Sequence, residues 1–148
     1  MMNVVYPLPY EINEKKGEYE LGINVNCIVN TNFKNKNALE MFKELWNNFT
    51  YGIGTLNIKK SDKINKNQFA ISNSLENILY PELKNGFEYV LDVDSKGVMI
   101  TGYDERGLIH AFSTLLQIIE ARNLDIKKEK FVIPYCSISD KPVINFRG

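Results

Sequence analysis

The clearest pattern of hydrophobic and polar positions lies in the second half of the chain, over residues 87–120. Apolar residues alternate with acidic ones from Phe87 to Val93, which is the period of a strand with one buried face. Asp94 and Gly97 then supply turn chemistry, a carboxylate that can bind its own backbone and a residue that tolerates positive φ. We predict a hairpin whose second strand covers residues 98–101.

A long amphipathic helix is predicted directly after this hairpin. Asp104 is a suitable N-cap, because its carboxylate can accept a hydrogen bond from the first helical turn. Apolar residues then recur three and four positions apart and form one stripe, comprising Leu108, Ala111, Phe112, Leu115, Leu116 and Ile119. We expect this stripe to pack on the hairpin.

The first half of the chain predicts a strand, a helix and two short strands. Residues 19–29 alternate between apolar and polar, which predicts a first strand with one exposed face. Asn37 and Glu40 form an Asn variant of the capping box ahead of a second apolar stripe, so we predict a helix over residues 38–49. Residues 55–58 and 69–71 are strand candidates, and the charged residues 59–68 form an exposed connection between them. Residues 75–83 are ambiguous, because Pro81 stops a helix there.

This order of elements predicts a mixed β-sheet with the two long helices packed on it, which is an α+β fold or an open α/β sandwich. The chain has 148 residues, of which 44% are hydrophobic and 11% aromatic. Such a chain can form one domain with a substantial core. No internal repeat and no low-complexity linker divides it.

Charge and composition exclude several classes of partner. Eighteen basic and eighteen acidic residues balance, the pI is about 6.6, and no basic stripe is present, so nucleic acid is not expected. No segment approaches the roughly 18 apolar residues that a membrane span needs, so no membrane partner is expected. The first residues lack the features of a signal peptide, which predicts a cytoplasmic location. Cys27 and Cys136 are then expected to be reduced thiols rather than a disulfide.

Candidate chemistry is sparse. The chain has one histidine and no H-E-x-x-H motif, so we expect no metal site and no cofactor. His110 lies with Ser113, Thr114 and Gln117 on the helix side opposite the apolar stripe. This side is either a sugar-binding face or, as we favour, a solvated or domain-facing surface.

Two further motifs have structural explanations. Asp104 and Glu105 are adjacent acids, but at the start of a helix they are stabilised by the helix dipole, so we interpret them as capping residues. The sequence Gly52-Ile53-Gly54 lacks the third glycine of a dinucleotide site and follows a helix, so we interpret it as a loop.

Several short motifs in the second half of the chain carry a family resemblance. They are Gly-Tyr-Asp-Glu-Arg-Gly before the helix, Ser-Thr-Leu-Leu-Gln within it, Ile133-Pro134, residues 138–142 (Ile-Ser-Asp-Lys-Pro) and the final Phe146-Arg147-Gly148. In this order they resemble the N-terminal domain of glycoside hydrolase family 20, the β-N-acetylhexosaminidases. Family 84, whose members remove β-linked N-acetylglucosamine, carries a similar leading domain and is the close alternative. The resemblance implies a zincin-like sandwich, a sheet with two helices on one face.

The resemblance also implies a domain division and one substrate-binding residue. Residues 1–140 correspond to the non-catalytic N-terminal domain, and residues 141–148 to the start of a truncated (β/α)8 catalytic barrel. Arg147 corresponds to an arginine that contacts hydroxyls of the terminal sugar, a role suited to the paired donors of a guanidinium. Members of the family retain anomeric configuration by substrate assistance, with an Asp that orients the acetamido group and an adjacent Glu as acid and base. No catalytic residue can be assigned within this chain.

The function implied is therefore that of a non-catalytic domain of an exo-β-N-acetylhexosaminidase, inactive by itself. Its implied partners are the catalytic barrel of the same polypeptide, which it buttresses through an apolar face, and an N-acetylhexosamine-containing glycan as substrate of the full enzyme. The competing hypothesis is a stand-alone carbohydrate- or protein-binding module. Such a module usually exposes several aromatic side chains. Trp46 instead belongs to the apolar stripe of a predicted helix, which counts against that alternative.

Overall fold

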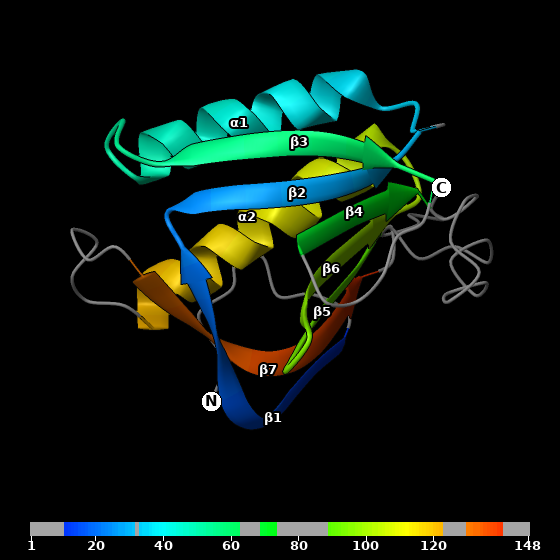
Figure 1. Ribbon diagram of the computed structural model, residues 1–148. Helices are drawn as coiled ribbons and strands as arrows, with labels where there is room; N and C mark the ends of the chain where they lie inside the picture. Colours follow the sequence, from blue (N-terminus) through cyan, green and yellow to red (C-terminus); the bar gives the residue numbers. More distant parts are fainter. Residues whose placement is uncertain (1–10, 32, 63–68, 74–88, 123–129, 141–148) are drawn as a thin grey trace, which may run out of the picture.

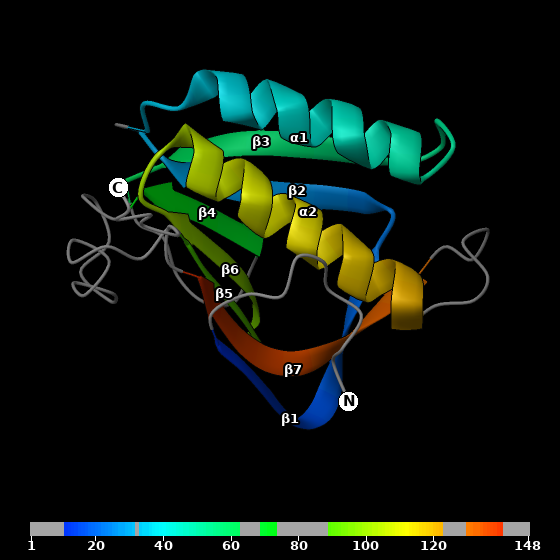
Figure 2. The ribbon, with the colours of Figure 1, turned by 180° about the vertical axis from the view of Figure 1, so that it is seen from behind.

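A computed structural model describes residues 11–31, 33–62, 69–73, 89–122 and 130–140. This part of the chain forms a seven-stranded mixed sheet with two helices on one face (Figure 1; Figure 2). The predicted α+β class, a mixed sheet carrying two long helices, is confirmed. The elements are β1 (Glu11–Gly22), β2 (Asn24–Asn30), α1 (Lys36–Phe49), β3 (Thr55–Ser61), β4 (Phe69–Asn73), β5 (Tyr89–Asp94), β6 (Gly97–Gly102), α2 (Glu105–Arg122) and β7 (Lys130–Asp140).

The sheet combines an antiparallel and a parallel half. The strand order is β1-β7-β5-β6-β4-β2-β3. The pairs β1–β7, β7–β5 and β5–β6 are antiparallel. The strands β6, β4, β2 and β3 run parallel to one another. Helix α1 is the crossover between the parallel strands β2 and β3, because a parallel pair cannot be joined by a tight turn. The two halves meet at β6.

The predicted hairpin and the predicted start of the second helix are confirmed. Asp94 pairs with Gly97 at the end of the hairpin, the Asp94 carboxylate accepts a hydrogen bond from the Lys96 backbone N–H at 2.8 Å, and Gly97 has φ 151°. Asp104 caps α2, since its Oδ1 accepts the backbone N–H of Gly107 at 2.9 Å. Local side-chain chemistry therefore fixes both connections.

The predicted cap of the first helix is wrong. Helix α1 begins at Lys36 and its N-cap is Asn35, which makes no side-chain cap hydrogen bond. Asn37 lies inside the helix and, like Glu40, is exposed. The backbone N–H of Phe33 bonds the Asn30 carbonyl at 3.0 Å, and the buried Phe33 side chain anchors this turn. The turn directs the chain into the helix before the capping pattern begins.

The single first strand predicted over residues 19–29 is also wrong, because the structure divides it between β1 and β2. Strand β1 ends at Gly22 and β2 begins at Asn24, with Ile23 at the bend between them. Strand β1 lies at one edge of the sheet beside β7, whereas β2 lies between β4 and β3. The alternation of apolar and polar residues continues through the bend, so periodicity alone did not reveal it.

Strand β7 was not predicted, and it contains a proline. Proline has no N–H for a sheet ladder and is confined to edges, ends and irregularities. Pro134 satisfies this rule because the pairing of β5 with β7 reaches only Cys136, and Pro134 faces Glu18 beside an irregularity in β1. Strand β3 also extends to Ser61, so Lys59 is part of a strand and not of the predicted exposed connection. Residues 75–83 lie outside the described part.

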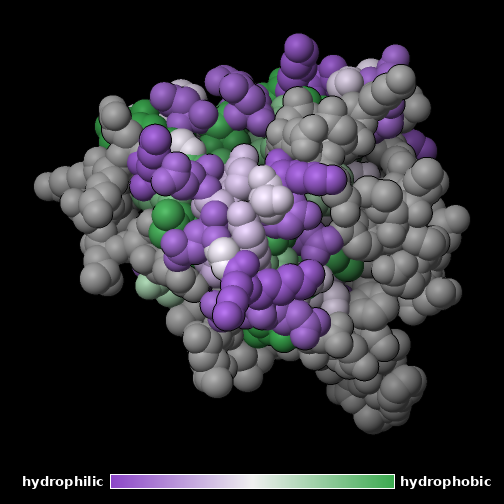
Figure 3. Space-filling view, turned by 60° about the horizontal axis from the view of Figure 1, so that its bottom comes forward, coloured by the Kyte–Doolittle hydropathy of each residue, from purple (hydrophilic) through white to green (hydrophobic). Residues whose placement is uncertain are grey.

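The core fills the space between the sheet and the two helices. Phe42 of α1 stacks on Phe112 of α2 with ring centroids 4.4 Å apart. The buried hydroxyls of Tyr89 and Thr114 are 2.9 Å apart and share a hydrogen bond that links β5 to α2. Both helices pack on one face, and none of the described residues forms a helix on the other face. From the side of β1 and β7 the described surface is mostly hydrophilic (Figure 3).

Candidate functional site

The structure describes some of the site residues predicted from the sequence and not others. Arg147 lies outside the described residues, so its contact with substrate stays a prediction, as does the boundary between residues 140 and 141. Asp104 is a capping residue, as predicted. The segment from Tyr51 to Gly54 is the loop between α1 and β3, where Tyr51 has φ 54° and Gly52 has φ 83°.

The polar side of α2 is narrower than predicted. His110 is exposed and Ser113 and Gln117 are half-buried, so these three share the outer side of the helix. Thr114 is buried and hydrogen-bonded to Tyr89, so its assignment to this surface is wrong. The helix presents only a thin polar strip because its other sides pack on β5, β6, β7 and α1.

The described residues provide no metal centre and no membrane-spanning helix. Among them, no three His, Cys, Asp or Glu side chains are grouped so that they could hold a metal ion. No helix in this part of the chain is long and apolar enough to cross a membrane.

Both cysteines are buried free thiols. Burial raises the pKa of Cys27 far above its ordinary value. The pKa of Cys136 rises to about 12, first through burial and then through the carboxylates of Asp92 and Glu14. Only a thiolate is an effective nucleophile, so these neutral thiols are structural.

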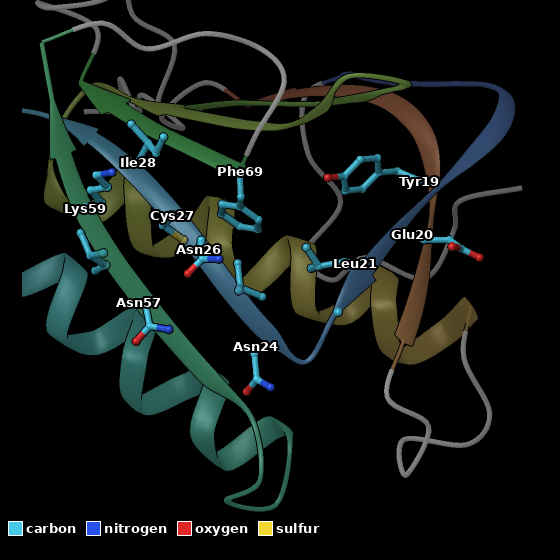
Figure 4. A pocket seen from close by; sticks show the side chains of 13 residues that line it. Tyr19, Glu20, Leu21, Asn24, Asn26, Cys27, Ile28, Asn57, Lys59 and Phe69 are labelled. Carbon is cyan, nitrogen blue, oxygen red and sulfur yellow. The ribbon is translucent and has the colours of Figure 1, made fainter.

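A hollow lies on the side of the sheet opposite the helices, between the end of β1 and strands β2, β3 and β4 (Figure 4). Its volume is about 750 Å³. It exists because β1 and β2 diverge at Ile23, and the Ile23 carbonyl is held by Trp46 Nε1 at 2.7 Å and by the Thr55 backbone N–H at 3.1 Å. We call this hollow the β1–β2 cavity.

One wall of the β1–β2 cavity is a row of polar side chains on two parallel strands. Asn26 of β2 pairs in register with Asn57 of β3. Two residues away in either direction, on the same face of the strands, Asn24 pairs with Thr55 and Ile28 with Lys59. Asn24 Oδ1 accepts a hydrogen bond from Thr55 Oγ1 at 3.0 Å. In the described part of the chain, no hydrogen bond or ion pair engages the side chains of Asn26, Asn57 and Lys59.

The facing wall is apolar and aromatic. Leu21 and Phe69 are buried and Tyr19 is half-buried. Figure 4 shows the Tyr19 ring directed across the opening toward Phe69, on the same side as Leu21. Glu20 points away from the cavity and lies 3.9 Å from Lys130. The cavity therefore combines neutral amides, one ammonium group and two aromatic rings.

This site was not predicted from the sequence, although the sequence contains a signal for it. Asparagine is depleted in strands because its amide favours turns and local backbone bonds. The strand β2 nevertheless reads Asn-Val-Asn-Cys-Ile-Val-Asn, with asparagine at three of the four alternate positions on one face. Asparagine repeated on one face of a strand indicates a role other than sheet formation.

Comparison with known families decides what this fold is. A model described as glycosyl hydrolase family 20, domain 2, matches residues 3–141. The chain belongs to this family. The resemblance found in the sequence motifs is thereby confirmed for family 20. No curated protein matches the chain.

Solved structures share the fold of this family 20 domain. An exo-β-N-acetylglucosaminidase from Vibrio harveyi in complex with N-acetylglucosamine is 24% identical with a TM-score of 0.69, and the match covers 97% of this chain and 20% of that one. The Flavobacterium johnsoniae chitobiase is 22% identical with a TM-score of 0.63, covering 94% of this chain and 21% of that one. A structure described as CpGH84B matches with a lower TM-score of 0.58 at 22% identity, covering 92% of this chain and 22% of that one.

The matches cover nearly all of this family 20 domain but only a small share of each solved protein. The chain spans about a fifth of the length of the solved proteins named above. This proportion fits a domain of a larger polypeptide.

Proposed function

We propose that this chain is a non-catalytic domain of a β-N-acetylhexosaminidase, an enzyme that releases terminal β-linked N-acetylhexosamine with retention of configuration. The observation that carries the proposal is the match of residues 3–141 to domain 2 of family 20. The substrate class comes from the family and from the named activity of the Vibrio harveyi protein. In the full enzyme, Arg147 would contact the terminal sugar from the start of the catalytic barrel.

The adjacent acids of this chain support a non-catalytic role. Substrate-assisted retaining hydrolysis needs an Asp and an adjacent Glu that face the substrate in a cleft. The adjacent pair Asp104 and Glu105 opens α2, and Asp104 is engaged in capping the helix. The catalytic acids would therefore be supplied by the barrel.

The layer of helices is the surface that we assign to the contact with the barrel. Both helices carry apolar side chains that are not fully buried, namely Met41 and Leu45 on α1 and Ile109 and Leu116 on α2. The described surface on the side of β1 and β7 is instead mostly hydrophilic (Figure 3). Burying apolar area stabilises an interface by roughly 25 cal/mol per Å², which favours the helix side for permanent contact.

The activity is tested with a chromogenic N-acetyl-β-glucosaminide. The full-length enzyme should hydrolyse it, and this chain alone should not. In the full-length enzyme, Arg147→Ala should lower kcat/KM by at least about tenfold, since each lost charged hydrogen bond is worth roughly 1.5–3 kcal/mol. Turnover that copurifies and scales with this chain would overturn the non-catalytic assignment.

The barrel contact is tested with a matched pair of substitutions, Ile109→Asn on the helix side and Ile28→Asn on the opposite side. Both residues are half-buried. In this chain alone the two variants should lose similar stability. In the full-length enzyme Ile109→Asn should lose clearly more, because its side chain would face the barrel. Equal losses in the full-length enzyme would contradict the assigned face.

A further inference from the structure

We propose that the β1–β2 cavity is a second glycan-binding site, which takes a neutral oligosaccharide containing N-acetylhexosamine. The choice of this sugar rests on the proposed function, whereas the choice of a neutral polyhydroxylated ligand rests on the cavity itself. Small-molecule sites usually have volumes of roughly 300–1,000 Å³. The volume of about 750 Å³ lies within this range and accommodates a short segment of sugar rings.

The polar wall has the chemistry that sugar hydroxyls and acetamido groups require. Each carboxamide offers two N–H donors and a carbonyl acceptor, and a hydroxyl is likewise both donor and acceptor. Asn26 and Asn57 stand side by side in register, and no other described residue engages their side chains. Lys59 adds an ammonium donor two residues further along β3. Among the described lining residues Glu20 is the only acid, and its carboxylate is directed away from the cavity toward Lys130.

The aromatic wall suits the other face of a sugar ring. Aromatic rings provide a rigid apolar surface, and the hydroxyl of Tyr remains available for hydrogen bonding. Tyr19 directs its ring across the cavity toward Phe69, with Leu21 beside it (Figure 4). A sugar ring placed between the two walls would meet C–H contacts on one side and amide hydrogen bonds on the other.

The site is preformed, which reduces the entropy cost of binding. The asparagines project from paired strands rather than from a loop, and Asn24 is held by Thr55. The bend at Ile23 that opens the cavity is fixed by Trp46. Helices α1 and α2 cover the other face of the sheet (Figure 2). A barrel in contact with the helices would therefore leave the exposed Asn26 and Asn57 accessible.

A glycan site away from the catalytic centre would hold a long substrate near the enzyme. Its loss should weaken the use of polymeric glycans and leave short substrates unaffected. The contrast between long and short substrates distinguishes the second site from the catalytic site. Damage to the catalytic site would affect the use of both substrates.

The first experiment is an NMR titration of this chain with oligomers of β-linked N-acetylglucosamine. Backbone and side-chain amide signals of Asn26 and Asn57 should shift, and the double variant Asn26→Ala/Asn57→Ala should bind at least about tenfold more weakly. The matched control is Asn47→Ala/Asn48→Ala, which removes two exposed amides from α1 on the opposite side. Tyr19→Ala should weaken binding as the asparagine variant does. Absence of shifts at Asn26 and Asn57, or equal weakening by the control, overturns the proposal.

The second experiment distinguishes this proposal from the proposed function. In the full-length enzyme, Asn26→Ala/Asn57→Ala should raise KM for a long polymer of N-acetylglucosamine and leave kcat/KM for the short chromogenic substrate unchanged. An active enzyme whose use of the polymer is insensitive to the variant overturns the second site alone. An unmodified full-length enzyme that is inactive on both substrates overturns the proposed function. Binding of glucose-based but not N-acetylglucosamine-based oligomers by this chain overturns the sugar class proposed for the cavity.

Discussion

The indole Nε1 of Trp46 donates a 2.7 Å hydrogen bond to the carbonyl oxygen of Ile23. Ile23 is the bend between β1 and β2, and the same oxygen accepts the backbone N–H of Thr55 at 3.1 Å. One side chain of α1 thus holds the point at which two strands diverge to different parts of the sheet. This bond connects the core of the domain to the wall of the β1–β2 cavity.

Substitution of Trp46 by Phe should lower the free energy of unfolding by about 2 kcal/mol. The variant keeps an aromatic ring but loses the N–H donor and part of the buried volume, and these losses add. Urea denaturation followed by circular dichroism measures the change. The control is Phe49→Leu in the same aromatic cluster, which removes a ring 5.8 Å from Trp46 without removing a hydrogen bond. The NMR amide signals of the cavity residues should shift in Trp46→Phe and not in Phe49→Leu. Shifts in Phe49→Leu but not in Trp46→Phe would contradict the role given to this hydrogen bond.

Substitution of Thr50 by Val should cost about 1–3 kcal/mol, although the two side chains have nearly the same shape. Thr50 is buried, and its hydroxyl donates to the Trp46 carbonyl at 2.9 Å and accepts the Gly54 N–H at 2.9 Å. Valine would leave both backbone groups without this partner. Thr31→Val is the matched control, because it removes an exposed hydroxyl bonded to Asp62 and should change stability by less than about 0.5 kcal/mol. Similar unfolding midpoints for the two variants would contradict the prediction.

Substitution of Gly102 by Ala should destabilise the domain by about 1–3 kcal/mol through overpacking. A Cβ at Gly102 would lie 2.7 Å from Leu108 Cγ and 2.8 Å from the Leu108 backbone nitrogen, where β6 meets the first turn of α2. Gly22→Ala is the control, because a Cβ there has no neighbour within 4 Å among the described residues. Thermal unfolding of both variants measures the difference, and a stable Gly102→Ala would show that the start of α2 can shift.

The two thiols should make the domain less stable at alkaline pH. The ordinary thiol pKa of 9.0 applies when the chain is unfolded, and folding raises the pKa of Cys136 to about 12. Between these values the unfolded state binds fewer protons, so the free energy of unfolding falls as pH rises, by at most about 1.4 kcal/mol per pH unit for each thiol. Below pH 9 this contribution is fully present. Urea denaturation at about pH 8 and about pH 10.5 measures the decline.

A Cys136→Ala variant should show a smaller decline with pH than the parent chain, because one titrating thiol has been removed. Both cysteines of the parent should also react slowly with a thiol reagent at neutral pH, and rapidly after unfolding in urea. Fast labelling of the folded chain, or an unchanged pH dependence in the variant, would contradict the buried and neutral state of these groups.

The sequence alone was sufficient for the elements whose structure depends on neighbouring residues. The hairpin follows from Asp94 and Gly97, the start of α2 from the Asp104 carboxylate three residues before Gly107, and both helices from apolar spacings of three and four. These interactions join residues within about one helical turn or one tight turn. The motifs of the second half also identified the family.

The tertiary structure alone decided the division of β1 from β2, the position of β7 and the β1–β2 cavity. Alternation of apolar and polar residues shows that a segment can be a strand, but not which strand it pairs with or where it bends. The bend at Ile23 depends on Trp46, 23 residues away, and the tolerance of Pro134 in β7 depends on where β5 ends and on the opposing Glu18 of β1. Asn26 and Asn57 become neighbours only when the β2–α1–β3 crossover closes. Contacts between distant residues are set by packing of the whole core. For that reason local sequence patterns predicted strand segments but not the cavity between them.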